Sequence, residues 1–119
     1  MGAKTIVQNF YKSDVLLESD KVNALLHPDV ILEWHSTKGF LKLNKDQMIE
    51  LSEGLSKAYV RSKTRISHIL SDGNTVSVRY SHYVKTIENP REEMLLAHFM
   101  VIWEVKDDKL YRGYQMSQL

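Results

Sequence analysis

Cysteine is absent from the 119 residues, which excludes disulfides, thiolate catalysis and thiolate metal sites. An excess of one charge is also lacking, because 16 basic and 15 acidic residues leave a net charge of +1. No basic stripe is present, so we do not expect nucleic acid as a partner. No apolar run approaches the ~20 residues of a membrane helix, and residues 1–6 carry no secretory pattern. We expect a cytoplasmic protein that does not bind membranes.

What is present is ordinary for a soluble globular protein, with 43% hydrophobic and 26% charged residues. We expect one domain over residues 1–119. A chain of this length buries about two-thirds of the surface that it exposes when unfolded. That burial supplies one core without metal or disulfide support.

Helical spacing dominates the first part of the chain. Ile6, Phe10 and Leu17 fall on one stripe, which predicts a helix over residues 1–18. A second short helix is predicted over residues 20–26. Two helices therefore precede the first strand.

The rest of the chain predicts one more helix and a series of strands. Residues 30–35 are rich in branched and aromatic side chains, as strands are. Asn44 and Gln47 have the spacing of a capping box and predict the start of a third helix. From Val60 onward we expect four strands, with turns at residues 72–74, 89–90 and 107–108. Helices followed by long antiparallel strands indicate an α+β protein.

Alternation predicts which side chains of the second and third long strands point inward. In residues 75–84 His82 shares a face with the apolar positions, which are Val76, Val78, Tyr80 and Val84. In residues 61–71 the inward set is Thr64, Ile66, His68 and Leu70. A three-residue loop keeps inward residues opposite one another, whereas a two-residue loop would not. The two histidines then lie about 13 Å apart, so they cannot share a metal ion and we expect no metal site.

The next strand is apolar on both faces. Its predicted inward residues are Leu95, Ala97, Phe99, Val101 and Trp103, with Phe99 opposite Tyr80. Its predicted outward residues are Leu96, His98, Met100 and Ile102. A strand that is apolar on both faces is usually buried on both. We therefore expect a homodimer that forms through the outward residues.

Four segments carry a resemblance to a known family: Phe10–Tyr11, residues 24–30 (ALLHPDV), residues 71–74 (SDGN) and residues 103–110 (WEVKDDKL). With the order of elements, they resemble the SnoaL-like branch of the nuclear-transport-factor-2-like superfamily. The resemblance implies a cone-shaped curved antiparallel sheet that wraps the N-terminal helix and leaves a pocket at its wide end. Members include polyketide cyclases, ketosteroid isomerases, dehydratases, epoxide hydrolases and binding modules, and many are homodimers.

The resemblance also places side chains in that pocket. An ungapped alignment puts Phe10, Trp34 and Val101 where ketosteroid isomerases carry a tyrosine and two aspartates, which argues against isomerase chemistry of that kind. It turns Leu32 and Trp34 inward. On the last strand it turns Gly113, Gln115 and Ser117 inward, although alternation alone also permits Arg112, Tyr114 and Met116.

The pocket is predicted to bind a small apolar molecule, aromatic or polycyclic, in a volume of a few hundred Å³. The predicted ligand-binding residues are Phe10, Leu32, Trp34, Tyr80, Ala97, Phe99, Val101, Trp103, Gly113 and Gln115. No cofactor is expected.

Catalysis is the alternative, as a cofactor-free lyase, isomerase or cyclase. His82, or else His68, would be the general base, with Asp14 on the first helix as its partner. A third possibility is a protein-interaction module without catalysis.

Overall fold

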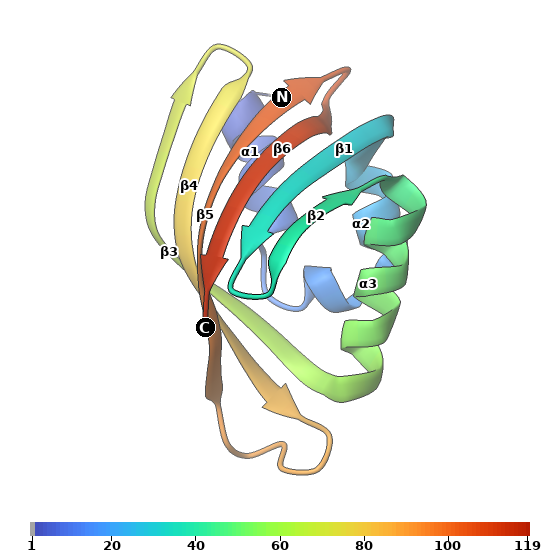
Figure 1. Ribbon diagram of the computed structural model, residues 1–119, viewed down its shortest axis with the longest axis vertical. Coiled ribbons are helices and arrows are strands. Elements are labelled where there is room, and N and C mark those ends of the chain that lie inside the picture. The colour runs from blue at the N-terminus through green and yellow to red at the C-terminus, as the bar shows by residue number, and fades with distance from the viewer. Residues whose placement is uncertain (1) are drawn as a thin grey trace.

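A computed structural model describes residues 2–119 of the chain (Figure 1). The helices are α1 (Ala3–Phe10), the short 3₁₀ helix η1 (Val15–Leu17), α2 (Ser19–Leu25) and α3 (Lys45–Ala58). The strands are β1 (Leu26–Ser36), β2 (Gly39–Leu43), β3 (Tyr59–Asp72), β4 (Thr75–Thr86), β5 (Met94–Lys106) and β6 (Lys109–Gln118). No helix within this part of the chain is both long and apolar enough to span a bilayer.

The strands form one bent sheet in the order β2-β1-β6-β5-β4-β3. Neighbouring strands are antiparallel, except that β1 runs parallel to β6. Figure 1 shows the sheet curving around the helices, which lie on its concave side. The predicted α+β class and the curved sheet that wraps the N-terminal helix are confirmed.

The first helix is shorter than predicted. It ends at Phe10 and is followed by a turn in which Asp14 has a left-handed backbone (φ 68°). Aspartate enters this region more readily than most residues. Hydrogen bonds stabilise the turn, because Asp14 donates its N–H to the carbonyl of Ser62 and accepts the Ser62 N–H on its carboxylate. Met1, where the helix was predicted to begin, lies outside the described residues.

The predicted start of the third helix is confirmed. The Asn44 side chain accepts the N–H of Gln47 at 3.0 Å, and the Gln47 side chain accepts the N–H of Asn44 at 2.9 Å. This reciprocal pair satisfies two donors that a helix start otherwise leaves unpaired. It fixes where α3 begins, and α3 covers one end of the concave face.

The core lies between the helices and the concave face of the sheet. The alternation predicted for β4 is confirmed, since the apolar set and His82 are all buried. On β6, Gly113 and Gln115 are buried while Tyr114 and Met116 are exposed, as the family resemblance implied. Burial of this apolar surface is the main stabilising contribution to the fold.

The prediction for β3 is wrong beyond Ile66. A bulge shifts the register between Ile66 and His68, so that Ile69 rather than His68 lies opposite the buried Val78. His68 is exposed, and Leu70 is 71% exposed. The turn also has two residues rather than three, because Asp72 pairs with Thr75. A bulge adds one residue to one strand and reverses the facing of those beyond it, and the shorter turn compensates for it.

A second bulge, in β5, corrects the predicted facing of Leu95 and Leu96. His82 pairs with Ala97 and Tyr83 with Leu95, which leaves Leu96 without a partner on β4. Leu95 is therefore exposed, whereas Leu96 lines the interior and is not part of the outward face. Beyond the bulge the prediction is confirmed, with Tyr80 opposite Phe99.

Candidate functional site

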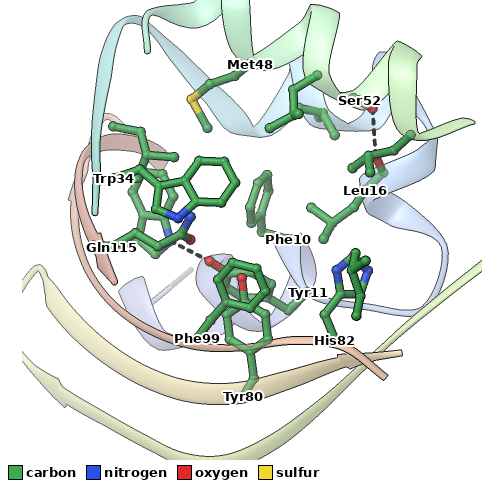
Figure 2. Close-up of a pocket in the computed structure, with 16 residues that line it drawn as sticks. Phe10, Tyr11, Leu16, Trp34, Met48, Ser52, Tyr80, His82, Phe99 and Gln115 are labelled. Carbon is green, nitrogen blue, oxygen red and sulfur yellow. Dashed lines mark hydrogen bonds between the residues drawn. The ribbon is translucent and has the colours of Figure 1, made fainter. Parts of the chain in front are cut away.

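An apolar cavity of about 120 Å³ lies between the concave face and the helices (Figure 2). We call it the inner cavity. Helices α1, α2 and α3, the 3₁₀ helix and strands β1, β4, β5 and β6 all contribute to its wall. The volume is smaller than the few hundred Å³ predicted from the sequence, because long side chains from α3 and η1 fill part of the space.

Seven of the ten predicted ligand-binding residues line the inner cavity: Phe10, Leu32, Trp34, Tyr80, Phe99, Trp103 and Gln115. Ala97 lines a neighbouring cleft instead. Val101 is buried in the core and does not reach the inner cavity. Aromatic rings make up much of the wall, and the rings of Tyr80 and Phe99 are stacked with centroids 4.9 Å apart.

Gly113 has a different role from the predicted one. A Cβ at this position would lie 2.6 Å from the Trp103 ring and 2.7 Å from a Leu32 methyl group. Glycine is needed because Trp103 and Leu32 occupy the space that the prediction had given to a ligand. Gly113 therefore positions Trp103 and does not line the inner cavity.

His82 is the titratable residue that the prediction placed correctly. It is 4% exposed, lines the inner cavity, and its Nε2 lies 2.6 Å from the Ser62 hydroxyl. Burial lowers the pKa of the imidazole from 6.5 to about 4, because a low-dielectric environment disfavours the charged form. His82 is thus neutral at physiological pH and offers one donor and one acceptor nitrogen.

The other two predicted catalytic residues lie outside the inner cavity. Asp14 bonds to Arg61 Nε at 3.1 Å and to the Ser62 N–H at 2.9 Å, so it is linked to His82 only through Ser62. His68 is exposed and bonds to its neighbour Ser67. Within residues 2–119, the predicted direct pair of Asp14 and His82 is therefore not formed.

Tyr11 is a cavity residue that the sequence analysis missed. Its hydroxyl accepts a hydrogen bond from Trp103 Nε1 at 2.9 Å, and its ring lies 4.6 Å from that of Tyr80. Burial raises the pKa of Tyr11 from 10.0 to about 12 and that of Tyr80 well above 10.0. Both phenols are neutral at pH 7. Tyr11 follows the buried Val7 by four residues, a helical spacing that could have identified it.

The wall of the inner cavity is uncharged. Among the residues that the structure describes, no Asp, Glu, Lys or Arg lines it. Its polar groups include His82, the two tyrosines, the Gln115 amide and Ser52, whose hydroxyl donates to the Leu16 carbonyl at 2.7 Å. Within residues 2–119 no three His, Asp or Glu side chains are grouped as metal ligands would be. The arrangement suits a neutral molecule that is mostly apolar.

A family model described as a SnoaL-like domain matches residues 7–113. None of the curated proteins matches the chain by sequence. Solved structures of the same fold do match.

Three solved structures illustrate that similarity. An LEH-like epoxide hydrolase from M. tuberculosis superposes with a TM-score of 0.74 at 18% identity, over 97% of this chain and 81% of that one. IdmH from Streptomyces antibioticus, proposed to be a polyketide cyclase, gives 0.73 at 10% identity, over 97% and 91%. A Catenulispora acidiphila protein with a ketosteroid isomerase-like fold, solved with trimethylamine, gives 0.69 at 9% identity, over 92% and 82%. Identities this low establish the fold and carry no activity.

Proposed function

Since this chain belongs to the SnoaL-like domain family, we propose that it binds a small, neutral, largely apolar molecule in the inner cavity. The observation that carries the proposal is an apolar cavity of about 120 Å³ with no charged side chain among its described lining residues. An engineered apolar cavity of about 150 Å³ holds benzene. The ligand that fits this conformation is therefore a single ring or an aliphatic molecule of similar size, and a polycyclic molecule is too large.

Two polar side chains would orient that ligand. Gln115 is 7% exposed and lines the inner cavity, and none of the hydrogen bonds among residues 2–119 uses its carboxamide. Its amide atoms are not fully enclosed, so the NH2 group can donate a hydrogen bond to a ligand oxygen. His82 has Nε2 on Ser62, which leaves Nδ1 for a ligand. A phenol, alcohol or ketone matches these groups.

Catalysis without a cofactor is the second candidate, and His82 is the observation that favours it. It is the titratable imidazole in the wall of the inner cavity, and Ser62 fixes its orientation. A base with a pKa of about 4 is weak at neutral pH, however, because proton transfer is most efficient when the pKa lies near the working pH. The acidic partner predicted for it, Asp14, is bound to Arg61 instead. Ligand binding needs none of this chemistry and is the better-supported function.

We also propose that the protein forms a homodimer through the convex side of the sheet. Met100 and Ile102 on β5 are 57% and 44% exposed, and Tyr114 and Met116 on β6 lie beside them. We call these four residues, with His98, the outer face. A groove of about 330 Å³ crosses it. Exposed apolar surface of this kind is typical of an interface.

Titration of neutral one-ring compounds tests the binding proposal. Both tryptophans of the chain, Trp34 and Trp103, line the inner cavity, so bound p-cresol should change the tryptophan fluorescence saturably. Benzoate should bind at least about tenfold more weakly, because a charge is expensive to bury without a partner. Equal binding of p-cresol and benzoate, or no saturable change with any neutral compound, would contradict the proposal.

A pair of variants locates the binding. Leu16 lines the inner cavity, whereas Leu70 is exposed on β3. Leu16→Phe adds a ring to the cavity wall and should weaken p-cresol binding about tenfold or more. Leu70→Phe makes the same chemical change on the surface and should leave binding unaltered.

A further inference from the structure

We infer that Trp34 determines the ligand size that this protein accepts, because its indole separates the inner cavity from a second compartment of the same binding site. The inference rests on the proposed function, since it concerns which molecules enter the inner cavity. Removal of the indole should join the two compartments and admit a polycyclic ligand.

The second compartment is a cleft of about 410 Å³, which we call the outer cleft. It lies between the end of β6, the first part of β5 and the turn from β1 to β2, and Ser36, Leu41 and Ala97 are among its lining residues. Trp34, Phe99 and Leu96 line both the inner cavity and the outer cleft. These three side chains are therefore the partition between the compartments.

Trp34 is the largest of the three and is held in place from the cleft side. Its Nε1 donates a hydrogen bond to the Ser117 hydroxyl at 2.8 Å, and Ser117 itself lines the outer cleft. The indole lies 6.2 Å from the Phe99 ring, centroid to centroid, at an angle of 45°. In Figure 2 the Trp34 side chain lies along one side of the inner cavity, across it from His82.

The two volumes indicate what the partition does. The inner cavity of about 120 Å³ matches a single ring, given that about 150 Å³ holds benzene. If the inner cavity and the outer cleft were joined, the volume of the site would lie within the ~300–1,000 Å³ typical of drug-sized ligands. Both compartments are mainly apolar, so a joined site would suit a neutral polycyclic molecule with one end beside Gln115 and His82.

The test compares p-cresol with 9-fluorenone, a neutral tricyclic ketone, by isothermal titration calorimetry on the full chain. Wild-type protein should bind p-cresol and bind 9-fluorenone at least about tenfold more weakly. Trp34→Ala should tighten 9-fluorenone binding by about tenfold or more, because the added rings can then bury apolar surface in the outer cleft. Ser117→Ala should give a smaller gain, since it removes the hydrogen bond but leaves the indole. Leu70→Ala, a truncation on the exposed surface, should change neither affinity.

The outcomes separate this inference from the proposed function. Equal binding of both probes to wild type would overturn the role of Trp34 and leave the proposed function standing. A gain of 9-fluorenone binding in Trp34→Ala, with no p-cresol binding to wild type, would support the partition and contradict the proposed ligand size. No binding of either probe to any of the proteins would overturn both. If Trp34→Ala does not unfold cooperatively, Trp34→Leu keeps apolar packing and replaces it, and a folded variant that gains no affinity overturns the inference.

Discussion

The two faces of β5 belong to one apolar run of sequence but differ in how far they are exposed to solvent. On the concave side Ala97, Phe99 and Trp103 are buried, with Trp103 1% exposed, whereas Met100 on the convex side is 57% exposed. Apolar character alone therefore does not reveal which face forms a site. The distinction comes from what covers each face, since the helices cover one and nothing within residues 2–119 covers the other.

Polar groups sharpen the same comparison. On the concave side several of them are buried and paired, as in the bonds from Trp103 to Tyr11 and between Ser62 and His82. On the convex side the bond between Ser81 and His98 is exposed to water. Burial strengthens the penalty for a broken hydrogen bond. Substitutions should therefore lower the free energy of unfolding more on the concave side than on the convex side.

The largest effect should come from Trp103→Ala. It removes a fully buried ring and the donor to the Tyr11 hydroxyl, so we expect the free energy of unfolding to fall by about 3–5 kcal/mol. Urea denaturation followed by far-ultraviolet circular dichroism measures it. Met116→Ala on the convex side is the control and should stay within about 0.5 kcal/mol, measured at a concentration where the protein is monomeric. Similar losses of unfolding free energy in both variants would contradict the expected difference between the two faces.

The next effect depends on pH and concerns His82. The unfolded imidazole takes up a proton near pH 6.5, but the folded one does so only near pH 4. Protonation between these values favours the unfolded state, so this residue destabilises the protein as pH falls from about 6.5 to about 4, by up to about 3 kcal/mol. It contributes no pH dependence above that window, where both states are neutral.

His82→Gln should flatten this part of the stability curve. The measurement is the midpoint of urea unfolding at several values between pH 4 and pH 7. His68→Gln is the matched control, because His68 is exposed on β3, and it should keep the wild-type slope. An unchanged slope in His82→Gln would show that the imidazole is not held neutral by burial.

A smaller loss of stability is expected from Gly113→Ala. The new methyl group would meet the Trp103 ring at 2.6 Å and Leu32 at 2.7 Å, and overpacking of this kind costs about 1–3 kcal/mol. Gly54→Ala in α3 is the control, since a Cβ there meets nothing within 4 Å. It should stabilise the protein by about 0.5–1 kcal/mol through helix propensity. If thermal unfolding shows equal shifts for the two variants, the close approach at Gly113 does not constrain the packing.

Sequence patterns predicted the parts of the fold that follow a fixed period. Alternation placed His82 and its neighbours on β4, and the capping-box spacing placed the start of α3. The errors fall where one residue breaks the period. The bulges near Ser67 and at Leu96 reverse the facing of the residues around them, and no local sequence signal marks either bulge.

The candidate site was harder to predict because it combines distant segments. The strand residues of the inner cavity followed from alternation and from the family resemblance, but Tyr11 did not. The helix was predicted to continue past it to residue 18, whereas contacts with Ser62, 48 residues after Asp14, end it early. The partition at Trp34 depends on a bond to Ser117, 83 residues away. Such long-range contacts are not visible in local periodicity.

The smallest effect on monomer stability should come from Met100→Glu, which tests the convex side directly. Met100 is 57% exposed and lines the groove of the outer face, so a monomer should lose no more than about 0.5 kcal/mol. In a dimer the same carboxylate would be buried against apolar side chains and would lie near its symmetry mate, which is unfavourable. Sedimentation velocity at micromolar concentration should therefore show a dimer for wild type and a monomer for the variant. Lys63→Glu, on the edge strand β3 away from the groove, should remain dimeric. A monomeric wild type, or a dimer that Met100→Glu leaves intact, would show that the outer face is not the interface.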